Sequence, residues 1–268
     1  MQKTNQATRA RRVGAGRVSE LGALFYRGPS LLTGDPIIGV LTGLEGGSLN
    51  AKTGPMVQAW IIRPDLAPME AKRQNLDDAI CGDCKLRGRD GFDSTCYVTV
   101  WLGPHNVWKM FSRAGYLEAT WPELQALVEG RYIRLGAYGD PAAIPFEVWR
   151  MLLATAAGWV AYTHQWRACD LRLQTIAMAS VDNELEWWDA SGAGWRTFRI
   201  RGAHDPLIGG AECVCPASDE ADHRTTCQRC QLCRGTNRPA RSVAIIAHGK
   251  PGNVAAFYRS RSDAIATI

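Results

Sequence analysis

The sequence has no long apolar run. Its longest apolar stretches, Ile37 to Leu44 and Met151 to Tyr162, are broken by glycine or polar residues. Both fall well short of the roughly 20 residues that a membrane-spanning helix needs, so we expect no contact with a membrane. The basic residues near the N-terminus are not followed by an apolar segment, so no secretory signal is readable and the expected location is the cytoplasm.

Several common catalytic motifs are also missing. The chain contains no G-x-S-x-G, no P-loop and no G-x-G-x-x-G pattern. These absences disfavour a serine hydrolase, a P-loop NTPase and a dinucleotide-binding fold. The chain also has no large excess of one charge sign, because its 31 Lys+Arg and 26 Asp+Glu give a formal net charge of only +5.

Much of the positive excess lies in residues 1–20, which carry five basic residues before the first acid at Glu20. We interpret this segment as a disordered basic arm. It is either a solvated tail or a nucleic-acid contact made through phosphates. Residues 21–53 are rich in Gly, Pro and Ser and are expected to form a loop-rich N-terminal extension.

From Met56 onward, short apolar runs alternate with longer amphipathic runs. This alternation predicts an α/β fold, a parallel sheet with crossover helices in a single domain over residues 21–268. A partial (β/α) barrel and an open doubly wound sheet both fit, and in either the functional groups gather at the carboxyl ends of the strands. The expected strands are Met56–Ile62, Tyr132–Tyr138, Trp159–Thr163, Ile176–Val181, Trp195–Ile200, Cys213–Cys215 and Val243–Ala247.

Most of the nine cysteines fall into two groups. The first group lies within residues 81–96, where a CxxC is followed after eleven intervening residues by a third cysteine; its members are Cys81, Cys84 and Cys96. The second lies within residues 213–233, where a CxxCxxC run follows an outlying cysteine beside a proline; its members are Cys215, Cys227, Cys230 and Cys233. In a reducing compartment such thiols are expected to be metal ligands rather than disulfides.

The spacing of the second group favours an iron–sulfur cluster over zinc. Tetrahedral zinc usually takes two separated pairs of ligands, whereas CxxCxxC with a remote Cys-Pro is typical of cubane clusters. The first group leaves three alternatives open: a [4Fe-4S] cluster with one open iron, a zinc site completed by His105 or an Asp, or one site shared with the second group. In the second alternative, the zinc site can also have a purely structural role, as a zinc knuckle that only holds its loop. Cys169 is expected to be a buried small hydrophobe.

Polar residues follow three successive predicted strands. Gly136, Gly139 and Asp140 lie in LGAYGDP, where the glycines permit positive φ and Asp140 can accept hydrogen bonds or cap the next helix. Tyr162 and His164 end the next strand, and Ser180 and Asp182 end the one after it. If the sheet is parallel these groups converge, which predicts an active site with Tyr162 and His164 as candidate catalytic residues.

The order of these motifs resembles a radical S-adenosylmethionine (SAM) enzyme. A three-cysteine loop follows the first strand, YGDP stands where that superfamily has a GGEP-like turn, and SVD lies near the end of the fourth strand. The superfamily's usual loop is CxxxCxxC, from which this loop departs. ICGDCKLRG to CYV, with CPASDEADHRTTCQRCQLC, is more closely similar to the gene-product-88-like Cys-rich proteins of bacteriophages and mobile elements, over roughly residues 48–250.

The resemblance implies a radical-SAM-like partial barrel and a set of ligand roles. The first cysteine group would hold a [4Fe-4S] cluster whose open iron meets SAM, with Gly139 and Asp140 at the SAM amino group and Ser180 and Asp182 near its ribose. The second group would hold an auxiliary cluster. We therefore expect an iron–sulfur enzyme with an unknown substrate, located in the host cytoplasm if the gene is phage-borne. The alternative is a non-catalytic zinc or iron–sulfur protein that contacts nucleic acid through its basic arm.

Overall fold

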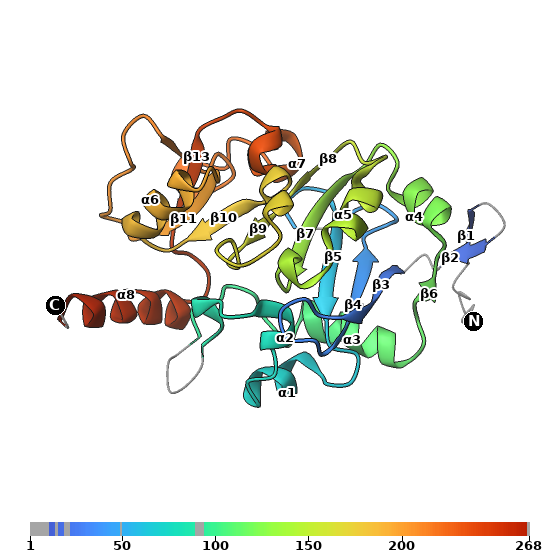
Figure 1. Cartoon of the computed structure of the whole chain (residues 1–268). Helices are drawn as coiled ribbons and strands as arrows, with labels where there is room; N and C mark the ends of the chain where they lie inside the picture. Colours follow the sequence, from blue (N-terminus) through green and yellow to red (C-terminus); the bar gives the residue numbers. More distant parts are fainter. Residues whose placement is uncertain (1–10, 14–15, 19–21, 49, 89–93, 267–268) are drawn as a thin grey trace, which may run out of the picture.

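The computed structural model describes residues 11–13, 16–18, 22–48, 50–88 and 94–266 (Figure 1). It is a mixed α/β structure with two larger sheets in which parallel pairing predominates. This confirms the α/β class predicted from the alternation of apolar and amphipathic runs.

The first sheet has six strands in the order β6-β3-β4-β5-β7-β8. β4 pairs antiparallel with both β3 and β5, whereas the pairs β5–β7, β7–β8 and β3–β6 are parallel. The strands are β3 (Ala23–Pro29), β4 (Pro36–Thr42), β5 (Val57–Ile62), β6 (Leu117–Glu118), β7 (Tyr132–Tyr138) and β8 (Gly158–Val160).

The second sheet has five strands in the order β12-β13-β11-β10-β9, and all of its pairs are parallel. Its strands are β9 (Tyr162–Thr163), β10 (Met178–Val181), β11 (Thr197–Arg201), β12 (Glu212–Val214) and β13 (Ser242–Ile246). The two sheets meet at Ala161, between β8 and β9. The carbonyl of Ala161 accepts from the amide of Met178 at 3.0 Å, while its own N–H donates to the carbonyl of Cys233 at 3.0 Å.

Helices connect and cover these strands. α4 and α5 contact each other and β3, α3 contacts β5, and α6 contacts β10 and β11. α4 begins with a capping box of Thr120 and Glu123, and α6 is capped by the side chain of Asn183, as expected for helix starts. The helices are α1 (Pro68–Arg73), α2 (Asp78–Cys81), α3 (Gly103–Ser112), α4 (Trp121–Val128), α5 (Phe146–Leu153), α6 (Glu184–Gly192), α7 (Cys227–Cys230) and α8 (Pro251–Ala266).

Five short 3₁₀ helices lie in the connections: η1 (Lys85–Arg87), η2 (Pro141–Ala143), η3 (Leu171–Thr175), η4 (Asp219–Ala221) and η5 (Gly235–Asn237). η2 follows β7 and η3 precedes β10, so both stand between strands of the parallel part of the fold. No helix in the described ranges has both the length and the apolar character needed to cross a membrane.

The main core is formed around the first sheet. Trp149 of α5 is fully buried, its ring lies 5.2 Å from that of Phe25, and its indole N–H donates to the carbonyl of Pro141 at 2.9 Å. A second, smaller core cluster combines apolar side chains of β8, β10 and β13 with the buried thiols of Cys215 and Cys233. The second cysteine group is therefore built into the packing of the second sheet.

The prediction of a loop-rich N-terminal extension over residues 21–53 is wrong for its central part. β3 and β4 form an antiparallel hairpin, and β4 carries five consecutive buried residues. One of the glycines that suggested loops, Gly39, serves packing instead. A Cβ at Gly39 would lie 2.5 Å from the ring of Phe25, so this strand position needs glycine to make room for the aromatic side chain.

Only part of the expected basic arm can be compared with the structure. Arg11–Val13 (β1) and Gly16–Val18 (β2) pair antiparallel, so these six residues form a short two-stranded ladder within the expected arm. The other residues of the arm, 1–10, 14–15 and 19–20, lie outside the described residues. The nucleic-acid contact stays a prediction.

Candidate functional site

One cavity of about 380 Å³ is lined by both cysteine groups. It also receives side chains from alternate positions of the parallel strands, such as Arg134 and Tyr138 of β7, Phe198 and Ile200 of β11, and Val243 of β13. Because alternate residues of a strand point to the same side, these strands turn one face toward the cavity. The cysteines that line it are Cys81, Cys84, Cys96, Cys215, Cys227, Cys230 and Cys233.

The GDP turn after β7 also lines this cavity. Gly136 has φ of 65° and Gly139 has φ of 84°, as the sequence predicted from the need for positive φ. A Cβ at Gly139 would stand 2.7 Å from the Cβ of Ile61, so the turn lies directly against β5. Asp140 accepts from the amide of Ala142 at 2.9 Å and caps η2, so the capping role proposed for it is confirmed.

Asp140 also connects two strand ends. Its carboxylate accepts from the backbone N–H of His164 at 2.7 Å, and its own N–H donates to the carbonyl of Ile80 at 2.6 Å. Burial is the main cause that raises the pKa of this carboxyl group, while the charge of His164 and the hydrogen bonds counteract it. Asp140 therefore joins the GDP turn, the end of β9 and the start of the first cysteine loop.

The other predicted site residues are divided between the cavity and its surroundings. Tyr162, His164 and Ser180 line the cavity with the GDP turn. Asp182 is not among the lining residues; its backbone N–H donates to Glu186 at 2.9 Å, and its charge contributes to the electrostatics of His164. Of the residues expected at the strand ends, Asp182 alone stands back from the cavity.

His164 has a strongly altered acidity. Burial by itself lowers its pKa, but Cys84, through charge and a side-chain hydrogen bond, together with Asp182 and Asp140, raises the pKa to about 10. The buried Nε2 atom of the ring has no hydrogen-bond partner in the structure. His164 thus combines a contact to a predicted ligand thiol with a polar atom that is unsatisfied in the absence of a bound group.

The first cysteine loop is held by backbone contacts close to its thiols. Cys81 ends α2, its carbonyl accepts from the side-chain amide of Gln165 at 3.0 Å, and the amide of Cys84 donates to it at 3.2 Å. The chain returns to the first part of the loop at Cys96, whose amide donates to the carbonyl of Leu86 at 2.8 Å. The eleven residues between Cys84 and Cys96 therefore do not separate these cysteines in space.

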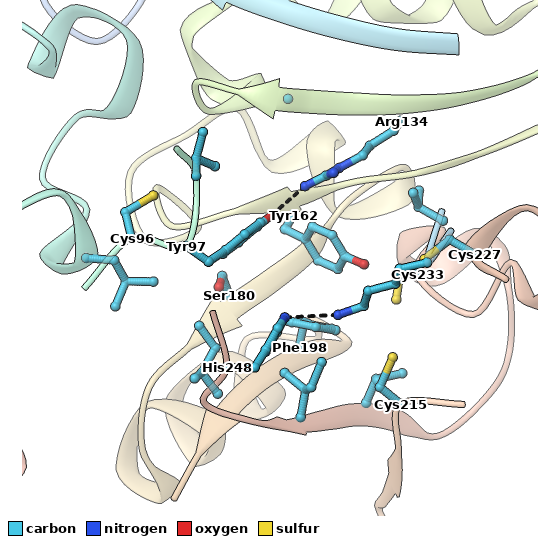
Figure 2. Close-up of a pocket in the computed structure, with 18 of the residues that line it drawn as sticks. Cys96, Tyr97, Arg134, Tyr162, Ser180, Phe198, Cys215, Cys227, Cys233 and His248 are labelled. Carbon is cyan, nitrogen blue, oxygen red and sulfur yellow. Dashed lines mark hydrogen bonds between the residues drawn. The ribbon is translucent and has the colours of Figure 1, made fainter. Parts of the chain in front are cut away.

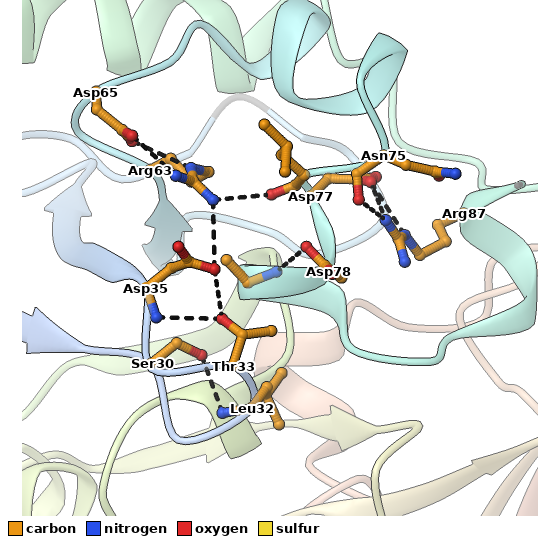
Figure 3. Close-up of polar contacts among 12 residues, drawn as sticks. Ser30, Leu32, Thr33, Asp35, Arg63, Asp65, Asn75, Asp77, Asp78 and Arg87 are labelled. Carbon is orange, nitrogen blue, oxygen red and sulfur yellow. Dashed lines mark hydrogen bonds and ion pairs between the residues drawn. The ribbon is translucent and has the colours of Figure 1, made fainter.

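A buried ion pair fixes the shape of this loop (Figure 3). The guanidinium of Arg87 is bonded to the carboxylate of Asp77, with side chains only 4% and 3% exposed. It also donates to the carbonyl of Gly82 at 3.0 Å and to that of Asn75 at 2.8 Å. One arginine therefore holds the segment before Cys81 and the turn between Cys81 and Cys84.

The second cysteine group lies at a different end of the first sheet from the one expected. The amide of Cys227 donates to the carbonyl of Lys52 at 2.9 Å, just before the amino end of β5, and Gln231 packs against Gly158 at the start of β8. The expectation that all functional groups gather at the carboxyl ends is therefore wrong for this part of the group, although Cys215 directly follows the carboxyl end of β12. The long connection from β12 to β13 carries it back across the cavity.

Figure 2 shows Cys215, Cys227 and Cys233 together at one side of the cavity and Cys96 at the other. The electrostatics give the same grouping. After burial, which is the largest effect, the charges of Cys84 and Cys96 help to raise the pKa of Cys81, and those of Cys215, Cys227 and Cys230 help to raise the pKa of Cys233. These interactions join thiols of the same group.

The donor set fits a soft metal or an iron–sulfur cluster in its chemistry. Burial raises the pKa of these thiols because it disfavours the thiolate form, and the positive charge of a bound metal would offset that cost. Buried polar atoms of three lining residues, Tyr138, His164 and Gln231, also lack partners. Within the described residues, no three Cys, His, Asp or Glu side chains are already grouped as ligands of one ion, so binding requires the thiols to converge.

Three further residues, two cysteines and one histidine, lie outside the cavity. Cys169 is partly buried against the main core, and burial raises its pKa to about 12, in keeping with a small hydrophobe. Cys213 lies in β12 and its thiol contacts the carbonyl of Ser242 at 3.5 Å. His105 packs its ring 6.0 Å from that of Trp108 in α3 and is not among the lining residues, so nothing here places it with the first group.

Several lining residues were not identified from the sequence, among them Lys52, Tyr97, Arg134 and His248. Figure 2 labels the last three. Lys52 Nζ lies 3.1 Å from Nε2 of His248, and Arg134 is bonded to the hydroxyl of Tyr97. The ring of Tyr97 stacks on that of His248, with centroids 5.9 Å apart. The only signal in the sequence is the placement of Tyr97 next to Cys96 and of a charged residue, Arg134, inside an otherwise apolar strand.

Comparisons with protein-family models, with curated proteins and with solved structures each found no match to this chain. Conclusions about its function therefore rest on the residues and geometry of the chain itself.

Proposed function

We propose that this chain is an iron–sulfur protein with two cluster sites and that it acts as a radical-SAM-like enzyme. The first group would hold a [4Fe-4S] cluster that binds SAM, and the second an auxiliary cluster. The observation that carries the proposal is that both cysteine groups and the GDP turn line one cavity. A shared cavity brings the expected cofactor ligands next to groups that can bind a substrate.

The strand order supports a partial barrel. Parallel pairing joins β5 to β7 and β7 to β8 in the first sheet, and β9 to β10, β10 to β11 and β11 to β13 in the second. These strands follow one another in sequence order, and the backbone hydrogen bonds of Ala161 bridge the break between β8 and β9. Strands that turn one face toward a common cavity must curve around it. This arrangement is the one that the resemblance to radical-SAM enzymes implies.

In this proposal the cluster and SAM supply the radical chemistry, and the chain supplies binding, orientation and exclusion of water. Gly139 lets the backbone of the GDP turn approach a ligand, and Asp140 fixes that turn to the end of β9. Ser180 provides a hydroxyl group in the cavity wall. Tyr162 and His164 are the side chains best placed to hold or move a proton of a bound substrate.

Anaerobic purification followed by iron and sulfide analysis tests the first half of the proposal. We expect a brown protein that contains both elements and absorbs near 400 nm. A colourless protein that contains zinc would contradict this and favour the non-catalytic alternative, in which metal sites only hold loops and the basic arm contacts nucleic acid.

The catalytic half needs a separate experiment. The iron-loaded protein is reduced with dithionite in the presence of SAM, and 5′-deoxyadenosine is measured by chromatography. The matched control is Cys84→Ala, which removes one thiol of the first group. If wild-type protein forms no more 5′-deoxyadenosine than this variant, the enzyme proposal fails even where a cluster is present.

A further inference from the structure

Two cationic side chains face the cavity without an ion-pair partner. In the described part of the chain, no carboxylate lies within ion-pair distance of Lys52 or Arg134. Lys52 Nζ contacts the ring of His248, and Arg134 donates to the hydroxyl of Tyr97. Both side chains are partly buried, so solvent compensates their charges only in part.

The two charges also act on each other. Burial lowers the pKa of Lys52 most, the charges of Cys215 and Cys227 raise it, and the positive charge of Arg134 lowers it again. Two cations that face one cavity are unfavourable unless an anion lies between them, because like charges repel and are incompletely hydrated there. The arrangement is the one expected of a site whose negative partner is a ligand.

The walls beside these cations are aromatic. The rings of Tyr162 and Phe198 pack with centroids 4.4 Å apart, and Tyr97, with 43% of its surface exposed, also lines the cavity (Figure 2). A cavity of about 380 Å³ falls within the usual range for small-molecule sites. It therefore offers an apolar surface and two hydrogen-bonding cations to the same ligand.

We propose that Lys52 and Arg134 form an oxyanion subsite that binds the carboxylate or phosphate group of a small molecule, whose remaining part packs on Tyr162, Phe198 and Tyr97. As a statement of substrate class, this inference rests on the proposed function. Anion binding itself requires only the cavity, so it can be tested whether or not the protein is an enzyme.

The competing explanation is that both cations serve only as countercharges for the second cysteine group. Their positive charges do act on Cys227, whose pKa they lower against the larger effect of burial. However, Arg134 reaches across to Tyr97, the neighbour of Cys96 in the other group. The cations therefore span the space between the two groups, where a substrate would lie.

Binding of three matched probes tests the proposal on the full-length, anaerobically purified protein of measured metal content. Phenyl phosphate and benzoate carry the two kinds of oxyanion, and phenol is the uncharged control. Isothermal titration calorimetry should show that at least one anion binds about tenfold more tightly than phenol. Comparison of the two anions distinguishes a phosphate ester from a carboxylate.

Variants then assign the binding to the two cations. Lys52→Met and Arg134→Met should each weaken anion binding about tenfold or more and leave phenol binding unchanged. Lys109→Met and Arg113→Met remove the same charges at exposed positions outside the cavity. These control variants should change the affinity for the anions less than about twofold. Lys52→Arg and Arg134→Lys keep the charge and retain most of the binding, which provides a test if the Met variants do not fold.

Two results would overturn the subsite. One is equal binding of the anions and phenol by wild-type protein. The other is a loss of metal in Lys52→Met and Arg134→Met with anion binding equal to that of the exposed controls, which would make the cations countercharges only. Anion binding by protein that holds no iron and forms no 5′-deoxyadenosine would instead refute the proposed function and leave the subsite standing.

Discussion

The buried carboxylate of Asp140 accepts a hydrogen bond of 2.7 Å from the backbone N–H of His164, 24 residues further along the chain. The same side chain accepts from the amide of Ala142 at 2.9 Å. One carboxylate thus satisfies two backbone donors in segments that follow different strands. Because both segments line the cavity, the position of His164 in the candidate site depends on Asp140.

Asp140→Ala should therefore destabilise the protein. The substitution leaves two backbone N–H groups without their acceptor in a buried place, and each such loss costs about 1–3 kcal/mol. We expect the free energy of unfolding to fall by about 2–4 kcal/mol in urea denaturation followed by circular dichroism. Asp189→Ala, which removes an exposed carboxylate of α6, should change it by less than about 0.5 kcal/mol. Equal losses in the two variants would contradict this role.

The parallel strands were predictable because their local pattern agrees with their environment. β7 occupies Tyr132–Tyr138, as expected from its apolar run, and alternate residues of its first half are buried. The GDP turn was predictable for the same reason, since Gly136 and Gly139 adopt the positive φ that only glycine takes easily. Local rules and tertiary structure coincide at these positions.

The missed features depend on contacts between distant residues. β3 and β4 were assigned to loops because glycine usually breaks strands, whereas Gly39 makes room for Phe25 of the neighbouring strand. Lys52 and Arg134 line the cavity from segments about eighty residues apart in the sequence, and no local pattern indicates that either is a site residue. The position of the second cysteine group depends on the path of the long connection after β12, which spacing alone does not determine.

The ion pair of Arg87 and Asp77 should be essential for the first cysteine loop. Arg87→Met leaves a buried carboxylate without its partner, which costs about 3–5 kcal/mol. We expect that loss in urea denaturation, together with less metal bound per chain. Arg73→Met, which breaks the exposed pair with Glu70, should change the stability much less. A result in which both variants retain wild-type stability and metal content would show that Arg87 does not hold the loop.

Gly139 and Gly130 form a matched pair for testing the GDP turn. Both have positive φ, 84° and 65°, so alanine at either position carries a backbone penalty of about 1–2 kcal/mol. At Gly139 the new Cβ would also lie 2.7 Å from the Cβ of Ile61, whereas at Gly130 no atom lies within 4 Å. Gly139→Ala should therefore lower the midpoint of thermal unfolding clearly more than Gly130→Ala. Similar midpoints would mean that the turn can move away from β5.

The two cysteine groups should lose metal independently. Cys81 interacts with Cys84 and Cys96, and Cys233 with Cys215, Cys227 and Cys230, so each set has its own electrostatic environment. If each holds one cluster of equal iron content, Cys81→Ala and Cys233→Ala each remove about half of the iron measured per chain, and the double variant removes nearly all.

Cys169→Ala is the matched control, because this thiol packs against the main core outside the cavity and should leave the iron content unchanged. Within the second group, Cys227→Ala, Cys230→Ala and Cys233→Ala should all remove the same fraction, since a cluster that loses one of its thiolates loses its iron as a unit. Complete loss of iron from a single substitution in either group would instead mean that thiols from both sides of the cavity share one site.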